Sequence, residues 1–190
     1  MGSDLLGRVS LVDELGYTFR SADNTRAYPQ EVDLTGGAQA SSVHGILVDG
    51  KPTIVVGDSG GASGVHEHSL CILESQVFVA VGAHVVSFEL GAESVSWILK
   101  VDEATCFGVH YSHLNDALIS HGELEIVRFS RDGGIVWTEG GADIFSEPIL
   151  LRSDFVEVTD FGGREYQLPY LTEIKPAEQA VPPKSDRAGG

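Results

Sequence analysis

Two histidines that flank one glutamate, His66 and His68, have the types and spacing that point most directly to chemistry, and Glu74 follows His68 in the chain. On a β-strand, residues i and i+2 face the same side, so the two imidazoles could bind one metal ion. The pattern therefore defines a candidate divalent-metal site of His66, His68 and Glu74. We favour the simpler interpretation, in which the histidines are surface or hydrogen-bonded residues and the chain has no cofactor.

A second motif, Gly57-Asp58-Ser59-Gly60-Gly61, resembles the nucleophile loop of trypsin-like serine proteases. Those enzymes also need a catalytic histidine and an aspartate that orients it. Here His44 is the only histidine before Ser59, and it lacks the sequence that surrounds the protease histidine. We interpret the motif as a glycine-rich connection between strands. We expect no catalytic residues and favour a non-enzymatic function.

The elements that must position these residues are short antiparallel strands. Apolar runs alternate with glycine, asparagine and aspartate, and no stretch has the i, i+3, i+4, i+7 spacing of an amphipathic helix. Asp49-Gly50 between two β-rich runs is the strongest hairpin signal, because both turn positions favour a positive φ. The expected strands cover residues 8–12, 16–19, 43–48, 53–56, 66–74, 76–81, 84–90, 94–100, 105–111, 117–120, 123–129, 134–138, 155–158 and 164–168.

Two tryptophans, Trp97 and Trp137, lie 40 residues apart, and each ends a similar stretch of sequence. This recurrence falls in the range of four-stranded propeller blades, roughly 40–45 residues each. We therefore expect an all-β fold, either an antiparallel β-sandwich or incomplete propeller-like sheets built from ~40-residue repeats. Both indoles should lie in the core, at equivalent places in neighbouring sheets.

The stretches from Val77 to Trp97 and from Leu118 to Trp137 resemble the repeats of quinoprotein-type (PQQ-like) β-propellers, which small bacterial all-β proteins also contain. The segment 132–137 is the best match to that repeat. The resemblance covers about half of the chain and implies propeller-like packing. It does not imply any quinone-binding residues.

The spacing from Gly60 to Gly82 is similar to the first motif of cupins, β-barrel proteins in which two histidines, a glutamate and a later histidine bind iron, manganese or zinc. The resemblance implies, as an alternative function, a metal-dependent enzyme that uses His66 and His68. The second cupin motif is missing from the sequence. The later ligand would have to be one of the downstream histidines, which are His110, His113 and His121.

The chain is expected to form a single all-β domain over residues 1–174. Residues 175–190 should form a disordered tail, because they contain three prolines and no large apolar residue after Val181. No apolar run reaches the roughly 18–20 residues of a membrane span, and no signal-peptide pattern is present. Cys71 and Cys106 lie in apolar surroundings and predict two free thiols, so we expect a cytoplasmic protein.

The net charge is −16, from 12 basic and 28 acidic residues. This charge disfavours direct contact with nucleic acid or with an anionic membrane, because phosphate groups attract cations. It favours the basic surface of another protein. The function that we favour is an acidic protein-interaction module, such as an inhibitor or immunity-type partner of a basic protein. The candidate partner-binding residues are Asp102, Glu103, Asp154, Glu157 and Asp160.

Overall fold

The computed structural model describes residues 7–92 and 94–171. Over these residues the chain forms fifteen strands in four sheets and one short 3-10 helix, η1 (Glu67–Ser69). None of the helical segments among them is long and apolar enough to cross a membrane. The all-β fold is confirmed, whereas the predicted tail at 175–190 lies outside the described residues.

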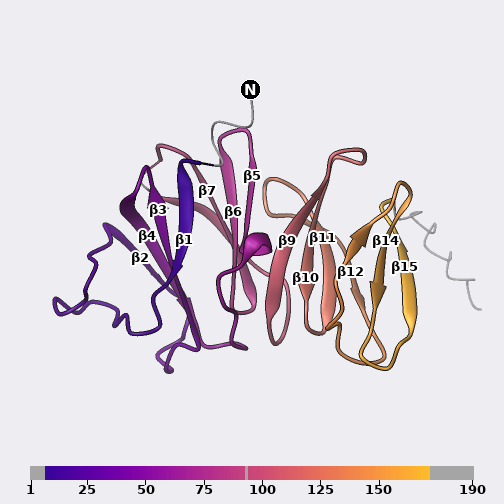
Figure 1. Ribbon diagram of the computed structural model, residues 1–190, viewed down its shortest axis with the longest axis horizontal. Coiled ribbons are helices and arrows are strands. Elements are labelled where there is room, and N and C mark those ends of the chain that lie inside the picture. The colour runs from indigo at the N-terminus through magenta and orange to yellow at the C-terminus, as the bar shows by residue number, and fades with distance from the viewer. Residues whose placement is uncertain (1–6, 93, 172–190) are drawn as a thin grey trace, which may run out of the picture.

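The four sheets, A to D, follow one another along the chain and stand side by side (Figure 1). Sheet A has the order β1-β3-β4-β2 and contains β1 (Val9–Asp13), β2 (Gln30–Asp33), β3 (Ser42–Val48) and β4 (Lys51–Asp58). Sheet B contains β5 (Leu70–Leu73), β6 (Gln76–Val81), β7 (His84–Glu89) and β8 (Val95–Lys100). Sheet C contains β9 (Cys106–Ser112), β10 (Ala117–Gly122), β11 (Glu125–Phe129) and β12 (Ile135–Gly140). Sheet D contains β13 (Leu150–Leu151), β14 (Phe155–Thr159) and β15 (Glu165–Pro169).

Neighbouring strands are antiparallel except β2, which pairs with β4 in parallel. The predicted hairpin at Asp49-Gly50 is confirmed, with φ values of 51° and 74° at the two turn positions. The predicted strand at residues 16–19 is wrong. Tyr17 and Phe19 lie instead in a loop and pack with Tyr28 on the outer face of sheet A, so burial of their rings replaces strand pairing.

The side chains of the central strands alternate between the two faces of their sheet, and this alternation explains how the sheets stack. Val77 and Val79 of β6 pack toward sheet A, while Phe78 and Ala80 pack toward sheet C. Because side chains of a strand alternate between two faces, a strand buried on both faces is a continuous apolar run. A third apolar layer joins sheets C and D. The first strands of sheets B and C, β5 and β9, contact one another.

The two tryptophans occupy equivalent places, as expected from the repeat. Trp97 lies on β8 opposite Ser87, and Trp137 lies on β12 opposite Arg128. Each indole packs from the last strand of its sheet toward the next sheet. Trp137 is buried, with 7% of its surface exposed, but Trp97 is only half-buried. The Trp97 indole N–H donates to the carbonyl oxygen of Arg131 (2.9 Å), which keeps its edge at the surface.

Two buried aspartates link one sheet to the next through hydrogen bonds. The Asp58 carboxylate, at the end of β4, accepts hydrogen bonds from the Ala83 N–H and from Nδ1 of His84, both at 2.8 Å. The Asp102 carboxylate, after β8, accepts from the N–H groups of Leu124 and Glu125, both at 2.9 Å. Each therefore binds the central turn of the following sheet. The glycine-rich segment after β4 belongs to the first of these contacts, in agreement with its interpretation as a connection between strands.

Candidate functional site: a histidine pocket and an acidic edge

His66 and His68 lie together, but Glu74 lies elsewhere. His66 precedes η1, and its Nδ1 accepts a hydrogen bond from the His68 N–H (3.2 Å). Residues 67–69 are therefore a 3-10 turn and not part of the predicted strand, so the same-face argument for the two imidazoles was wrong. Glu74 occupies the β5–β6 turn with a φ of 57° and forms an ion pair with Arg131 (3.3 Å).

Tertiary packing brings His68 to two histidines of sheet C. The short helix η1 contacts β9, where Gly108 leaves room for it: a Cβ at Gly108 would lie 2.7 Å from the Cβ of His68. His110 follows two positions later on β9, and His121 of β10 is paired with Gly108. Since paired residues project to the same face of a sheet, His110 and His121 share the face on which η1 lies.

These histidines line a pocket of about 390 Å³. The ring centroids of His68 and His110 are 4.4 Å apart, and those of His110 and His121 are 6.2 Å apart. The apolar part of the wall consists of Phe107, Pro148 and Ile149. The pocket thus lies where η1, sheet C and the segment before sheet D meet, with several imidazoles grouped beside an apolar surface.

Burial keeps two of these imidazoles uncharged. It lowers the pKa of His110 to about 3, and the nearby His68 adds a smaller lowering effect. Burial likewise lowers the pKa of His121 to about 4. At neutral pH both rings are therefore neutral, and each has a nitrogen lone pair that can accept a proton donor or bind a metal ion.

His121 has an unsatisfied polar atom. The residue is 7% exposed, and its buried Nε2 has no hydrogen-bond partner among the described residues. His44 is also buried, yet its two ring nitrogens lie 3.0 Å and 3.1 Å from the carbonyl oxygens of Ala80 and Ser63. Leaving a buried polar atom without a partner costs about 1–3 kcal/mol. This contrast marks His121 as the buried histidine that lacks a partner on one ring nitrogen.

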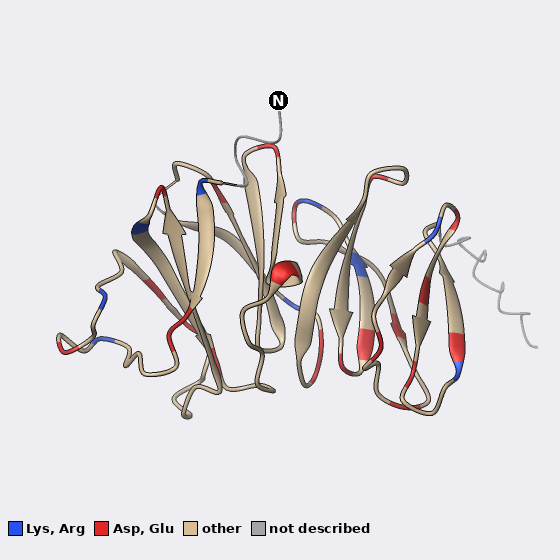
Figure 2. Cartoon of the chain, viewed as in Figure 1, with Lys and Arg blue, Asp and Glu red and all other residues tan. Residues whose placement is uncertain are grey.

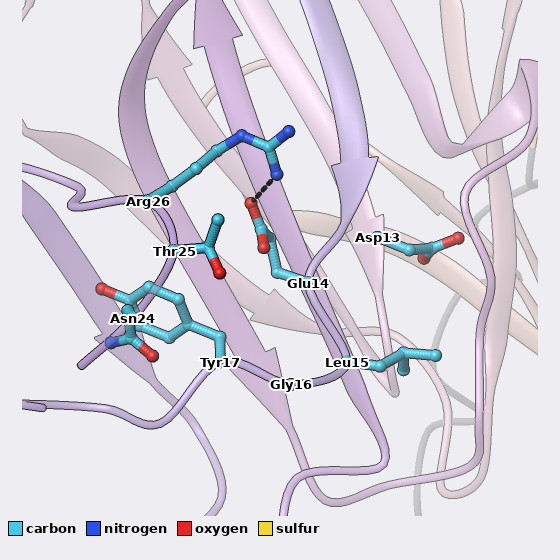
Figure 3. A pocket seen from close by; sticks show the side chains of 8 residues that line it. All are labelled: Asp13, Glu14, Leu15, Gly16, Tyr17, Asn24, Thr25 and Arg26. Carbon is cyan, nitrogen blue, oxygen red and sulfur yellow. Dashed lines mark hydrogen bonds and ion pairs between the residues drawn. The ribbon is translucent and has the colours of Figure 1, made fainter.

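A second hollow, of about 250 Å³, lies at the end of β1 (Figure 3). Its Glu14 and Arg26 side chains point toward one another and form an ion pair of 2.8 Å. Glu14 also accepts a hydrogen bond from the Tyr28 hydroxyl (2.7 Å). Glu14 therefore satisfies both Arg26 and the Tyr28 hydroxyl in this hollow.

A third feature is the lower edge of the stack, formed by the β6–β7, β10–β11 and β14–β15 turns and by the connections after β8 and β12. Hydrogen bonds join these segments: the Cys106 N–H donates to the Gly82 carbonyl, and the Phe161 N–H donates to that of Ile144. Carboxylates gather here, and in sheets C and D many red segments follow this side (Figure 2). The acidic residues of the lower edge are Asp58, Asp102, Glu103, Glu123, Glu125, Glu139, Asp143, Asp160 and Glu165.

The structure does not gather the five predicted partner-binding residues on one surface. Asp102 and Asp160 belong to the lower edge but are only 1% and 2% exposed, and both are occupied by internal hydrogen bonds. Glu103 is exposed on that edge and pairs with Lys100. Asp154 lies in the turn between β13 and β14 at the opposite edge, and Glu157 on β14 pairs with Arg152. Asp102 and Asp160 therefore serve the fold, and their expected role as surface contacts needs correction.

Sequence reasoning missed the carboxylates that are available on the lower edge. Glu123, Glu125, Glu139, Asp143 and Glu165 form no ion pair with any described residue. Burial raises the pKa of Glu125, and the charges of Asp102 and Glu103 raise it further. The predicted strand order could have located these carboxylates, because alternate turns of an antiparallel sheet return to the same edge.

Two histidines of the pocket were considered only as possible later cupin ligands. His110 falls in the strand predicted at 105–111, whereas His121 directly follows the strand predicted at 117–120 and belongs to β10 in the structure. The register that places them on one face depends on the geometry of the β9–β10 turn, which the apolar pattern of the strands does not specify. Their approach to His68 depends on the packing of η1, which no local pattern indicates.

No protein-family model and no curated protein sequence matches the chain. Among solved structures, the chain is similar to the C-terminal WD40 domain of Sif2, with a TM-score of 0.53 and 10% identity, over 73% of this chain and 42% of that chain. The WD40 β-propeller domain of Doa1 has a TM-score of 0.44 and 12% identity, over 61% and 40% of the two chains. BamB from Moraxella catarrhalis has a TM-score of 0.46 and 13% identity, over 81% and 51%. The similarity to the Sif2 domain shows a propeller-like fold, and the chain spans about two fifths of the length of the two WD40 domains.

Proposed function

We propose that the protein is a non-enzymatic interaction module whose lower edge binds a basic surface of another protein, as an inhibitor or immunity-type partner would. The observation that carries this proposal is the group of carboxylates without ion pairs on that edge: Glu123, Glu125, Glu139, Asp143 and Glu165. A basic partner could neutralise them without first breaking internal ion pairs.

The opposite, upper edge supports the proposal by contrast. There the arginines neutralise nearby carboxylates: Arg8 pairs with Asp49 at 2.7 Å, and Arg131 pairs with Glu74 at 3.3 Å. Two carboxylates are thus neutralised by arginines at the upper edge, whereas five carboxylates of the lower edge form no ion pair with a described residue. Because the lower edge is built from turns of stacked sheets, the carboxylates are presented by a rigid frame, which limits the entropy lost on binding.

The metal-dependent enzyme alternative has lost its predicted carboxylate ligand, because Glu74 pairs with Arg131. We also infer that the repeats belong to the quinoprotein-type group, which the segment 132–137 supports.

We further infer a cytoplasmic location, which two free cysteines support, since thiols persist in a reducing compartment. Burial raises the pKa of Cys71 to about 11 and that of Cys106 to about 12, so both thiols are protonated at neutral pH.

The test is binding of a fluorescent, lysine- and arginine-rich peptide, measured by anisotropy with the whole chain. The variant Glu123→Gln/Glu125→Gln/Glu139→Gln removes three charges from the lower edge. The matched control, Asp23→Asn/Glu89→Gln/Asp154→Asn, removes three charges outside that edge. We expect the lower-edge variant to weaken binding roughly tenfold and the control less than twofold, since charges close to the partner contribute most.

A second readout locates the contact directly. Amide resonances that shift on adding the peptide should belong to the lower-edge turns, and the shifts should shrink as salt rises. Equal loss of affinity in the two triple variants would mean that net charge alone attracts the peptide. That result would overturn the proposal.

A further inference from the structure

We propose that His68, His110 and His121 form a binding site for a divalent transition-metal ion, specifically zinc, where η1 meets sheet C. The site lies in the histidine pocket and uses none of the lower-edge carboxylates that have no ion pair. It is therefore independent of the proposed protein-binding function, and the two can fail separately.

The first argument is the unsatisfied nitrogen of His121. Its Nε2 is buried and has no hydrogen-bond partner among the described residues, although the residue is only 7% exposed. The residue His121 lines a pocket that also contains His68 and His110. A metal ion bound to this nitrogen would replace the missing partner and remove the cost of burying it alone.

The second argument is the spacing of the rings. Zinc binds an imidazole nitrogen at about 2.0–2.1 Å, which places the ring centroid about 3.2 Å from the metal. Two rings on one tetrahedral zinc ion then have centroids about 5.2 Å apart. The observed centroid separations are 4.4 Å for His68–His110 and 6.2 Å for His110–His121. The first separation is shorter and the second is longer than this value, so the rings are near enough to share one ion only after they rotate.

The site is not preformed. Among the described residues, no three histidine, cysteine, aspartate or glutamate side chains already converge on one point. His68 is the residue that can move most, because its side chain is 49% exposed and lies on the short turn η1. Rotation of this exposed imidazole costs little compared with rearranging a core residue. The two buried histidines, held by the β9–β10 pairing, provide the fixed part of the site.

The donor set selects the class of ion. Three imidazole nitrogens suit zinc, copper and nickel, whereas magnesium and calcium require oxygen ligands. The Glu67 carboxylate lies 3.2 Å from Nε2 of His68 and supplies a negative charge beside the proposed ion. Three protein ligands leave a coordination position open toward the pocket, which is about 390 Å³ in volume.

The experiment is a calorimetric titration of zinc into tag-free, chelator-treated protein at pH 7.5. We expect one ion per chain, and the variants His68→Gln and His121→Gln should each weaken binding tenfold or more. His113→Gln is the matched control, because His113 is exposed and lies outside the pocket. Its affinity should stay within about twofold of the unmodified chain.

A second measurement guards against misfolding. Cobalt titration followed by visible absorption reports ligand geometry, and circular dichroism reports whether each variant is folded. If His121→Gln does not fold, the exposed His68→Gln decides the question, since its side chain is not part of the core. No zinc binding at about 100 μM, or the same loss of affinity in His113→Gln as in His68→Gln, would overturn the proposal.

Discussion

At the scale of single residues, acidic side chains in this protein have two separate roles. Asp102 was predicted as a partner contact because it lies in an acidic stretch, yet it is buried and accepts hydrogen bonds from Ala104, Leu124 and Glu125. Backbone N–H donors stabilise a buried carboxylate, because they replace the hydrogen bonds that it would make with water. Asp102 therefore joins sheet B to sheet C, and composition alone could not separate this role from that of an exposed glutamate.

We predict that Asp102→Ala destabilises the fold by about 2–4 kcal/mol, because it leaves buried N–H groups without an acceptor. The measurement is urea denaturation followed by circular dichroism. Asp154→Ala is the control, since that exposed residue should change the stability by no more than about 0.5 kcal/mol. An unchanged midpoint for Asp102→Ala would show that the three N–H groups find other partners.

The buried histidines predict a loss of stability as the pH falls. The folded pKa values of His110 and His121 are about 3 and about 4, below the usual value of 6.5. The unfolded chain therefore binds more protons than the folded chain below pH 6.5, and folding loses roughly 1–2 kcal/mol per histidine between pH 6.5 and pH 5. Urea midpoints at these pH values give the slope, which His121→Gln should reduce and the exposed His113→Gln should not. Identical slopes in both variants would contradict this account.

At the scale of elements, the repeat places equivalent residues on equivalent strands. Trp97 and Trp137 both lie on the last strand of a four-stranded sheet, but the environments of the two indoles differ. Trp137 packs with Phe145, Ile149 and Val156 between sheets C and D. Trp97 keeps one edge at the surface through its hydrogen bond to Arg131. The repeat thus determines where each tryptophan lies in its sheet, and packing against the neighbouring sheet determines how deeply its indole is buried.

We predict that Trp137→Ala costs about 3–5 kcal/mol, the range for truncating a large aromatic residue in a core. Trp97→Ala should cost less, because a half-buried ring removes less apolar area from water. Chemical denaturation of the two variants measures the difference. If both substitutions had equal effects, burial would not be what separates the two indoles.

At the scale of the whole molecule, the stacked sheets place negative charge unevenly. The net charge is −16, and five carboxylates of the lower edge form no ion pair with a described residue. Self-repulsion of this kind destabilises the compact state, and salt screens it over about 8–10 Å at ionic strengths of 0.1–0.15 M. The charge that suits a basic partner is therefore also a source of instability in the free protein.

We predict that the melting temperature rises by a few degrees between about 10 mM and 150 mM sodium chloride, because screening relieves this repulsion. Differential scanning calorimetry measures the shift. Glu123→Gln/Glu125→Gln/Glu139→Gln should shrink the shift more than Asp23→Asn/Glu89→Gln/Asp154→Asn does. A melting temperature that does not change with the sodium chloride concentration would show that the lower-edge charges do not repel one another measurably.

The sequence by itself determined the local structure. Most strands were predicted within a few residues, because apolar alternation and turn residues such as Asp49-Gly50 act over short distances. It also determined the repeat, since Trp97 and Trp137 recur at a spacing that one sheet requires. Residues 66–69 and 16–19 were mispredicted because contacts with other segments, and not local preference, decide their conformation.

Only the tertiary structure decided which residues meet. His68, His110 and His121 come from segments whose approach depends on η1 packing over Gly108, a contact between distant parts of the chain. The same holds for the acidic residues: Asp102 and Glu103 are adjacent in sequence, but one is buried against the next sheet and the other is exposed. Charge and residue type are properties of the sequence, whereas burial and proximity arise from the packing of one sheet on another.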